Sequence, residues 1–156
     1  MPKKAEMKSK PEISGLNVAA KERNLGLIRK FIGAGMKNSR FPRKKISALA
    51  VSVTEHCENL IRHAYKKKSG KVGLKLELKY PEAKITALDS GPRFDMTKQK
   101  IPDTSRRLKK GLGGKMGIKT ILALCDAVEY KRKNGRNENT FIVLVKNPGK
   151  ENKWQR

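Results

Sequence analysis

Three polar residues in the middle of the chain recur at a helical spacing. Glu55, Asn59 and His63 stand at i, i+4 and i+8 in the segment EHCENLIRHAY, so a helix would present them on one side. A carboxylate can serve as a general base, and an amide oxygen suits a hard cation such as Mg²⁺. The same spacing also fits the solvated polar edge of an amphipathic helix.

A carboxylate ends an apolar strand pattern in ITALDSGPRFD, residues 85–95. Asp89 at the strand end could accept a hydrogen bond from an exocyclic amine, and Gly91 would let a flat ring approach the backbone. An ordinary Asp-x-Gly turn explains the same residues equally well.

A glycine-rich segment, KKGLGGKMGIKTI, precedes a helical pattern at residues 109–121. The free N–H groups and the dipole at a helix start suit phosphate. The dinucleotide-binding fingerprint does not fit, because its glycines should follow a strand and these follow a basic loop. A Walker motif does not fit either, because Met116 stands where a Ser or Thr should bind the metal. The lysines that add charge here are Lys109, Lys110 and Lys115.

Apolar periodicity places these three segments on the elements of one small fold. Alternating or short apolar runs predict strands over 13–20, 72–78, 85–88, 127–133 and 140–145, and apolar stripes predict helices over 21–37, 43–65 and from 111–117 to about 125. Residues 90–108 lack periodicity and predict a loop. This order predicts an α/β fold of the α+β sandwich type, with a mixed, mostly antiparallel sheet and about three helices on one face.

The 156 residues suffice for one domain, which we expect over residues 13–146, between basic tails at 1–12 and 147–156. The chain shows no secretion leader pattern and no apolar run of membrane-spanning length, so we expect a cytoplasmic protein that does not enter a membrane. Cys57 and Cys125 stand alone in helical patterns. They predict buried core thiols rather than a disulfide or a zinc site.

The formal net charge of +24, from 38 Lys and Arg against 14 Asp and Glu, would attract nucleic acid, nucleotide phosphates or an acidic protein. Most of this charge is spread over the body of the chain. Aromatic residues are only 5% of the sequence, and no RRM, KH or zinc-finger pattern interleaves them with the charges. Generic steering by a basic surface is therefore favoured over dedicated nucleic-acid binding.

Taken in order, the three segments resemble the N, G1 and G2 boxes of the Bergerat (GHKL) ATPase superfamily. The resemblance is strongest to the anti-sigma factor serine kinases of the RsbW and SpoIIAB kind, and it runs from Ile13 to Val145. It rests on ALAVSVTEHCENLIRHAY, DSGPRFD and GIKTILALCDAVEY. The resemblance implies the histidine kinase-like ATPase fold with ATP and Mg²⁺ as cofactors.

Roles for individual residues follow from the resemblance alone. Glu55 would be the catalytic base, Asn59 would hold Mg²⁺, and Asp89 would recognise the adenine amine. Thr140 would lie near the adenine, and residues 96–113 would form a lid over the nucleotide. The other nucleotide-binding residues implied are His63, Gly91, Arg93, Phe94, Gly111, Gly113, Gly114, Lys115, Met116 and Gly117. Arg93 and Lys115 depart from the pattern, since other members often have glycine at these positions.

The resemblance implies an ATP-dependent serine protein kinase that acts as an anti-sigma factor. Such a protein phosphorylates a STAS-type anti-anti-sigma protein, sequesters a sigma factor and forms a homodimer. The length excludes the gyrase, MutL and Hsp90 machines, and both histidines lie within the long helix, which argues against a self-contained histidine kinase. Two alternatives stay open: an ATP-binding switch that transfers no phosphate, and a basic accessory protein that binds nucleic acid.

Overall fold

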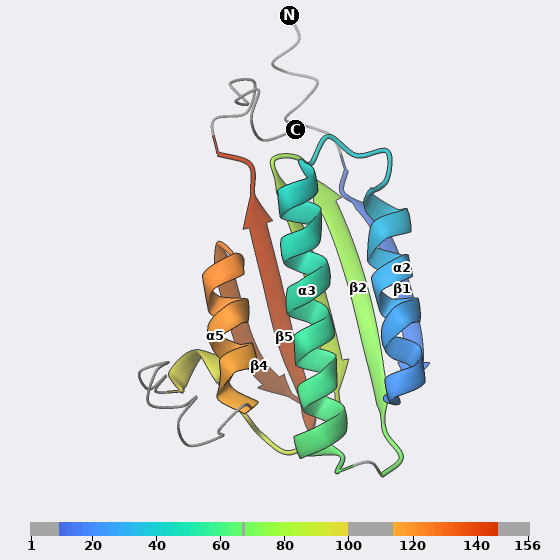
Figure 1. Cartoon of the computed structure of the whole chain (residues 1–156), viewed down its shortest axis with the longest axis vertical. Coiled ribbons are helices and arrows are strands. Elements are labelled where there is room, and N and C mark those ends of the chain that lie inside the picture. The colour runs from blue at the N-terminus through green and yellow to red at the C-terminus, as the bar shows by residue number, and fades with distance from the viewer. Residues whose placement is uncertain (1–9, 67, 100–113, 147–156) are drawn as a thin grey trace, which may run out of the picture.

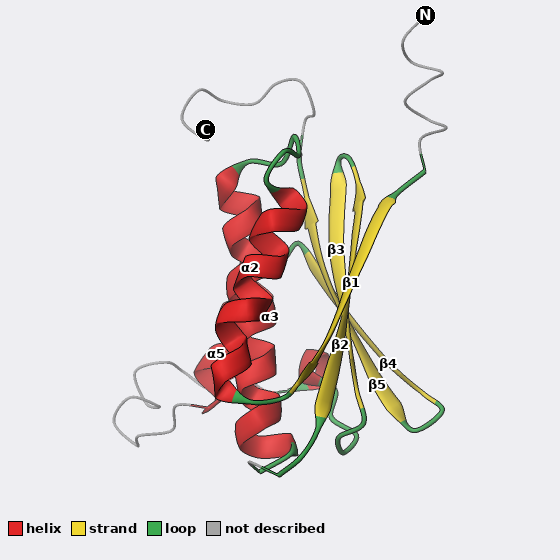
Figure 2. Cartoon of the chain, turned by 90° about the vertical axis from the view of Figure 1, so that its right-hand side faces the viewer, coloured by secondary structure: helices red, strands yellow, loops and turns green. Residues whose placement is uncertain are grey.

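The computed structural model describes residues 10–66, 68–99 and 114–146, with the side chains of 114–116 left out. They contain three α-helices and a five-stranded sheet. The helices form one layer that covers one face of the sheet (Figures 1 and 2). The strands are β1 (Glu12–Ala19), β2 (Lys71–Lys79), β3 (Glu82–Asp89), β4 (Ala127–Lys133) and β5 (Arg136–Leu144), and the helices are α2 (Leu25–Met36), α3 (Arg43–Asn59) and α5 (Gly114–Leu124).

The strand order in the sheet is β1-β2-β3-β5-β4, and all four pairings are antiparallel. The predicted fold class is confirmed, but the expectation of a mixed sheet was wrong. Both β2–β3 and β4–β5 are hairpins, and β5 runs opposite to each of its two neighbours. Strict alternation in β2 and β3 buries every second side chain under the helices, as expected for a sheet covered on one face.

The last turn of the long helix differs from a regular continuation. After α3, residues Leu60–Ala64 form a π-helical turn, with the Tyr65 amide donating to the Leu60 carbonyl at 2.8 Å. The Tyr65 hydroxyl then donates to the Lys71 carbonyl at 2.9 Å and accepts from the Ser90 amide at 3.1 Å. The end of the helix is thereby tied to the start of β2 and to the residue after β3.

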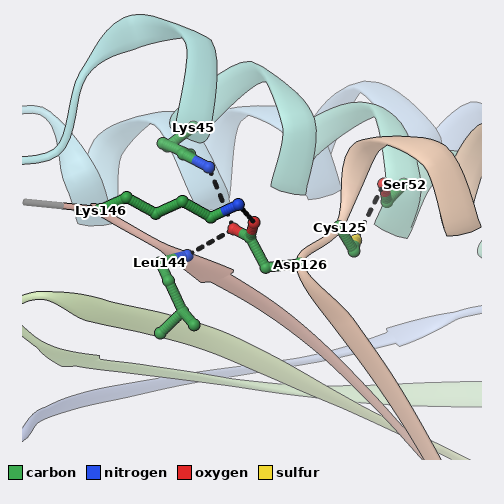
Figure 3. A network of polar contacts seen from close by, with 6 residues as sticks. All are labelled: Lys45, Ser52, Cys125, Asp126, Leu144 and Lys146. Atoms are coloured by element: carbon green, nitrogen blue, oxygen red, sulfur yellow. Dashed lines mark hydrogen bonds and ion pairs between the residues drawn. The ribbon is translucent and has the colours of Figure 1, made fainter.

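The C-terminal end of α5 is fixed by a network around Asp126 (Figure 3). The Asp126 carboxylate accepts from the Leu144 amide at 2.7 Å and from Lys45 Nζ at 3.0 Å, and Lys146 Nζ lies 3.8 Å away. Burial alone would raise the pKa of Asp126, but the Leu144 amide and the two lysines outweigh it and lower the pKa below its ordinary value. The network joins the junction of α5 and β4 to β5 and to the start of α3.

Both cysteines are buried, as predicted. The Cys125 thiol donates to the Ser52 hydroxyl at 3.3 Å, which ties the end of α5 to the middle of α3. Burial, with a smaller effect of the Asp89 charge, raises the pKa of the Cys57 thiol to about 12. The Cys57 thiol is therefore not ionised at neutral pH.

Several predicted boundaries need correction. β5 begins at Arg136, four residues before the predicted start, directly after a tight turn in which Asn134 and Gly135 have φ of 53° and 73°. The predicted loop contains a 3₁₀ turn, Met96–Lys98, in which Met96 is 3% exposed and belongs to the core. Residues 100–113 of the predicted lid, most of the predicted N-terminal tail and all of the predicted C-terminal tail lie outside the described residues. No helix in the described ranges is long and apolar enough to cross a membrane.

Candidate functional site

The C-terminal end of α3 packs beside the start of α5 (Figure 1), and Glu55 and Asn59 belong to this part of α3. A Cβ placed on Gly117 would sit 2.8 Å from Glu55 Oε2 and 3.5 Å from Asn59 Nδ2. Both polar side chains are half-buried. They therefore border the α5 backbone, whereas His63, the third residue of the spacing, is exposed. The absence of a side chain at Gly117 is what gives Glu55 this approach.

The backbone facing these two side chains is the first turn of α5. The helix begins at Gly114, so the N–H groups of residues 114–116 have no partner within the helix. Such groups, together with the helix dipole, favour an anion. Gly111 and Gly113 lie outside the described residues, and so do the side chains of Lys115 and Met116, so their assignment stays a prediction.

Asp89, the last residue of β3, is 3% exposed, and its two carboxylate oxygens have different surroundings. Oδ1 accepts from the Gly91 amide at 2.9 Å and from Asn137 Nδ2 at 3.0 Å. Oδ2 is buried and has no hydrogen-bond partner among the described residues. The Asp-x-Gly turn is therefore present, and it leaves one acceptor for a ligand that carries an N–H donor.

Gly91 occupies a place where a side chain would not fit freely. A Cβ there would lie 3.0 Å from Asp89 Oδ1 and 3.2 Å from the Ala64 Cβ. The glycine thus allows the turn after β3 to pack against the π-helical end of α3.

Asn137 organises this turn, and the sequence reasoning did not find it. It lies directly opposite Asp89 in the β3–β5 pairing. Besides its bond to Asp89, its Nδ2 donates to the carbonyls of Gly91 at 3.2 Å and Pro92 at 2.9 Å. Asn137 is 3% exposed, and only the strand register, which spacing does not reveal, brings it here.

Two residues of β4 complete the support of Asn137. Its Oδ1 accepts from the Tyr130 hydroxyl at 2.6 Å and from the Arg132 guanidinium at 2.9 Å. The same guanidinium nitrogen donates to the Gly91 carbonyl at 3.0 Å. The turn that carries Asp89 is therefore held by a network that spans three strands.

Thr140 does not lie beside Asp89 in the sheet. Asp89 pairs with Asn137, whereas Thr140 pairs with Thr86 and shares a hydrogen bond with it, Oγ1 to Oγ1, at 3.2 Å. Because side chains alternate along a strand, Thr140 faces the side of the sheet away from the helices. The prediction that Thr140 lies near the adenine is corrected accordingly.

Three further predicted residues are exposed: His63, Arg93 and Phe94. Phe94 is 49% exposed. No contact found among the described residues draws any of the three toward Asp89, so their part in a site stays a prediction.

The sequence matches the family described as the histidine kinase-like ATPase domain over residues 18–145. The match covers most of the chain and includes Glu55, Asn59, Asp89 and Gly117. This chain therefore belongs to the histidine kinase-like ATPase domain family, whose members are nucleotide-binding proteins.

Among characterised proteins, the chain is similar to the serine-protein kinase RsbW of Halalkalibacterium halodurans, with 28% identity over 129 residues covering 80% of this chain and 79% of the relative. It is 27% identical over 128 residues to the RsbW of Bacillus pumilus, covering 77% and 78%. It is 25% identical over 135 residues to the RsbW of Bacillus subtilis, covering 83% and 84%.

A solved structure of the RsbU and RsbW domains of Rv1364c from Mycobacterium tuberculosis superposes with a TM-score of 0.55 at 14% identity. The alignment covers 84% of this chain and 32% of that chain. At this identity the likeness bears on the fold alone.

Proposed function

We propose that this protein is an Mg²⁺- and ATP-dependent serine protein kinase that acts as an anti-sigma factor. The observation that carries the proposal is the convergence of Glu55 and Asn59 on the backbone of Gly117, at the start of α5. The similarity to serine-protein kinases of the RsbW type supports the activity.

The adenine end of ATP fits Asp89. Its Oδ2 is a buried acceptor without a partner in the described part of the chain, and leaving such a group unpaired costs about 1–3 kcal/mol. An exocyclic amine would supply the missing donor. Gly91, packed closely against Ala64, leaves no side chain over the turn that a ring would approach.

The phosphate end fits Asn59 and the first turn of α5. The described residues contain no group of three or more His, Cys, Asp and Glu that could hold a metal. Mg²⁺ would therefore be held by the Asn59 amide oxygen and by nucleotide phosphates, as is usual for this ion. The phosphates would rest on the unpaired N–H groups of residues 114–116.

Glu55 would accept the proton of the attacking serine hydroxyl. The serine oxygen would bond to the γ-phosphorus while the bond between the γ-phosphorus and the β-phosphate oxygen breaks. A positioned general base typically contributes 10²- to 10⁴-fold. The remaining work of the chain is alignment of the two substrates and neutralisation of charge.

The protein substrate in this proposal is a serine on a STAS-type anti-anti-sigma protein. A sigma factor is the competing partner, and the kinase acts as a homodimer. The net charge of +24 would steer an acidic partner toward the surface.

The test is incubation of the protein with labelled ATP and Mg²⁺ beside STAS proteins from the same genome, followed by identification of the phosphorylated serine. We expect Glu55→Ala to bind ATP but transfer no phosphate, and Asn59→Ala to fold but lose Mg²⁺-ATP binding. Glu58→Ala is the matched control, because Glu58 lies on the same helix and pairs with Arg62 at 2.7 Å instead.

Undiminished transfer by Glu55→Ala would remove Glu55 as the base. Normal nucleotide affinity in a folded Asn59→Ala would remove the proposed metal position. Regulation that persists in Glu55→Ala without any transfer would identify a nucleotide-dependent switch instead of a kinase.

A further inference from the structure

Three buried side-chain atoms lack a hydrogen-bond partner in the described ranges: Asp89 Oδ2, His56 Nε2 and Asn139 Oδ1. The residues are 3%, 6% and 2% exposed. Buried polar groups are nearly always paired in folded proteins, so each such atom needs an explanation. The proposed function uses only the first of the three.

The three atoms belong to one region between α3 and the sheet. Asn139 lies directly opposite Ala87, two residues before Asp89 on β3, so alternation places Asn139 on the same face as Asp89. Ala87 is fully buried and offers only a methyl group. At the paired positions 87/139 and 89/137 of β3 and β5, the larger side chains are therefore polar.

His56 reaches this region from α3. Its ring centroid lies 5.3 Å from that of Phe141, two residues beyond Asn139 on β5. Burial lowers the pKa of His56 to about 4, and the nearby Asp89 charge opposes this in part. At neutral pH the imidazole is uncharged, with one ring nitrogen that donates and one that accepts.

These groups match the edge of adenine. Its exocyclic amine carries two N–H donors beside a ring nitrogen that accepts. Two oxygen acceptors and a neutral imidazole complement that arrangement, whereas the carbonyl oxygen of guanine would meet two acceptors.

We propose that His56 and Asn139 recognise the nucleobase together with Asp89, and thereby set the specificity of the site for a purine with an exocyclic 6-amine. This inference rests on the proposed function, because it concerns the same nucleotide site.

The test uses His56→Phe and Asn139→Leu, which keep shape and remove the unpaired atom. Because an unpaired buried polar group is costly, neither change should lower the melting temperature of the nucleotide-free protein. The affinity for ATP should fall by about 5- to 30-fold in each variant, corresponding to the loss of one hydrogen bond to the base. Thr140→Val on the opposite face of the sheet is the control and should leave ATP affinity unchanged.

A second ligand distinguishes the loss of a contact to the base from a general effect of the substitution on the structure of the site. Purine riboside 5′-triphosphate lacks the amine but keeps the ring nitrogen, so its affinity should fall less than that of ATP in Asn139→Leu and as much as that of ATP in His56→Phe. Equal losses for both triphosphates in Asn139→Leu, or ATP binding as in the wild type in either variant, would overturn the inference. If the wild-type protein bound no ATP, the proposed function would be overturned as well. If the wild-type protein bound ATP and both variants bound it equally well, only the inference would be overturned.

Discussion

Replacing Gly117 by alanine should separate helix stability from phosphoryl transfer. Alanine inside a helix is favoured over glycine by up to about 1 kcal/mol. At Gly117, however, the new Cβ would lie 2.8 Å from Glu55 Oε2, closer than the 3.0 Å below which something must shift. Asn59 Nδ2, at 3.5 Å, is in ordinary contact and can stay in place. The Glu55 carboxylate must therefore move by several tenths of an ångström.

A misplacement of about 1 Å at a reacting group can cost roughly 100-fold in rate, so a shift of several tenths of an ångström should cost up to roughly 10-fold. We expect Gly117→Ala to lower the single-turnover rate of transfer to the STAS substrate by this factor. The Kd for ATP should change less, because Asn59 and Asp89 keep their positions.

Gly33→Ala is the matched control, because a Cβ at Gly33 in α2 meets nothing within 4 Å. It should show the same gain in helix propensity by thermal unfolding without an effect on transfer. The reasoning is refuted if Gly117→Ala transfers phosphate as fast as Gly33→Ala, since Glu55 would then not need its present position.

Two further predictions concern the parts that hold the site. Asn137→Leu should lower the free energy of unfolding by about 2–4 kcal/mol and weaken ATP binding. The change leaves Asp89 and the carbonyls of Gly91 and Pro92 without the donor that they share. If urea unfolded this variant and the wild type equally, the network would be dispensable. Asp126→Asn should lower the free energy of unfolding at pH 7, and the difference should begin to shrink near the ordinary aspartate value of 3.8 and be lost as the pH falls through the lower pKa of the folded state. The sign follows from the lowered pKa in the folded state, since the charged form contributes stability above the unfolded pKa and loses it as the carboxylate is protonated. A difference that stays constant across a series of urea titrations from pH 7 to pH 3 would contradict it.

The sequence predicted the elements best where one apolar period dominates. The stripe through Leu49, Val53 and Cys57 predicted α3, and all three residues are buried. The alternation from Val72 to Leu78 predicted β2 with the correct face inward. In both cases burial on one side of a regular element leaves a direct trace in the residue pattern.

The start of β5 was missed because its residues do not look like a strand. The run Arg-Asn-Glu-Asn, residues 136–139, is wholly polar, yet Asn137 and Asn139 are buried. Polar residues that face a ligand or a hydrogen-bond network give the same local signal as a loop. Without the start of the strand its register is unknown, and a shift of one residue moves Thr140 from one face of the sheet to the other.

The site is also held in place by the last residue of the first segment and by a residue outside all three segments. Tyr65, after the π-helical turn, binds the Ser90 amide, while Asn137 binds Asp89 and the next carbonyls from β5. With the turn held from both sides, Asp89 presents its free oxygen in a defined direction before any ligand arrives, which reduces the cost of binding.

The same hydrogen bonds explain how this chain can have Arg93 where other members often have glycine. A third glycine at that position would serve a turn whose backbone must adapt to the nucleotide. Here the carbonyls of Gly91 and Pro92 are already held by Asn137, and the Arg93 side chain is exposed. An arginine can therefore occupy the position without disturbing the buried part of the turn, so Arg93→Gly should leave ATP affinity nearly unchanged, whereas Asn137→Leu should not.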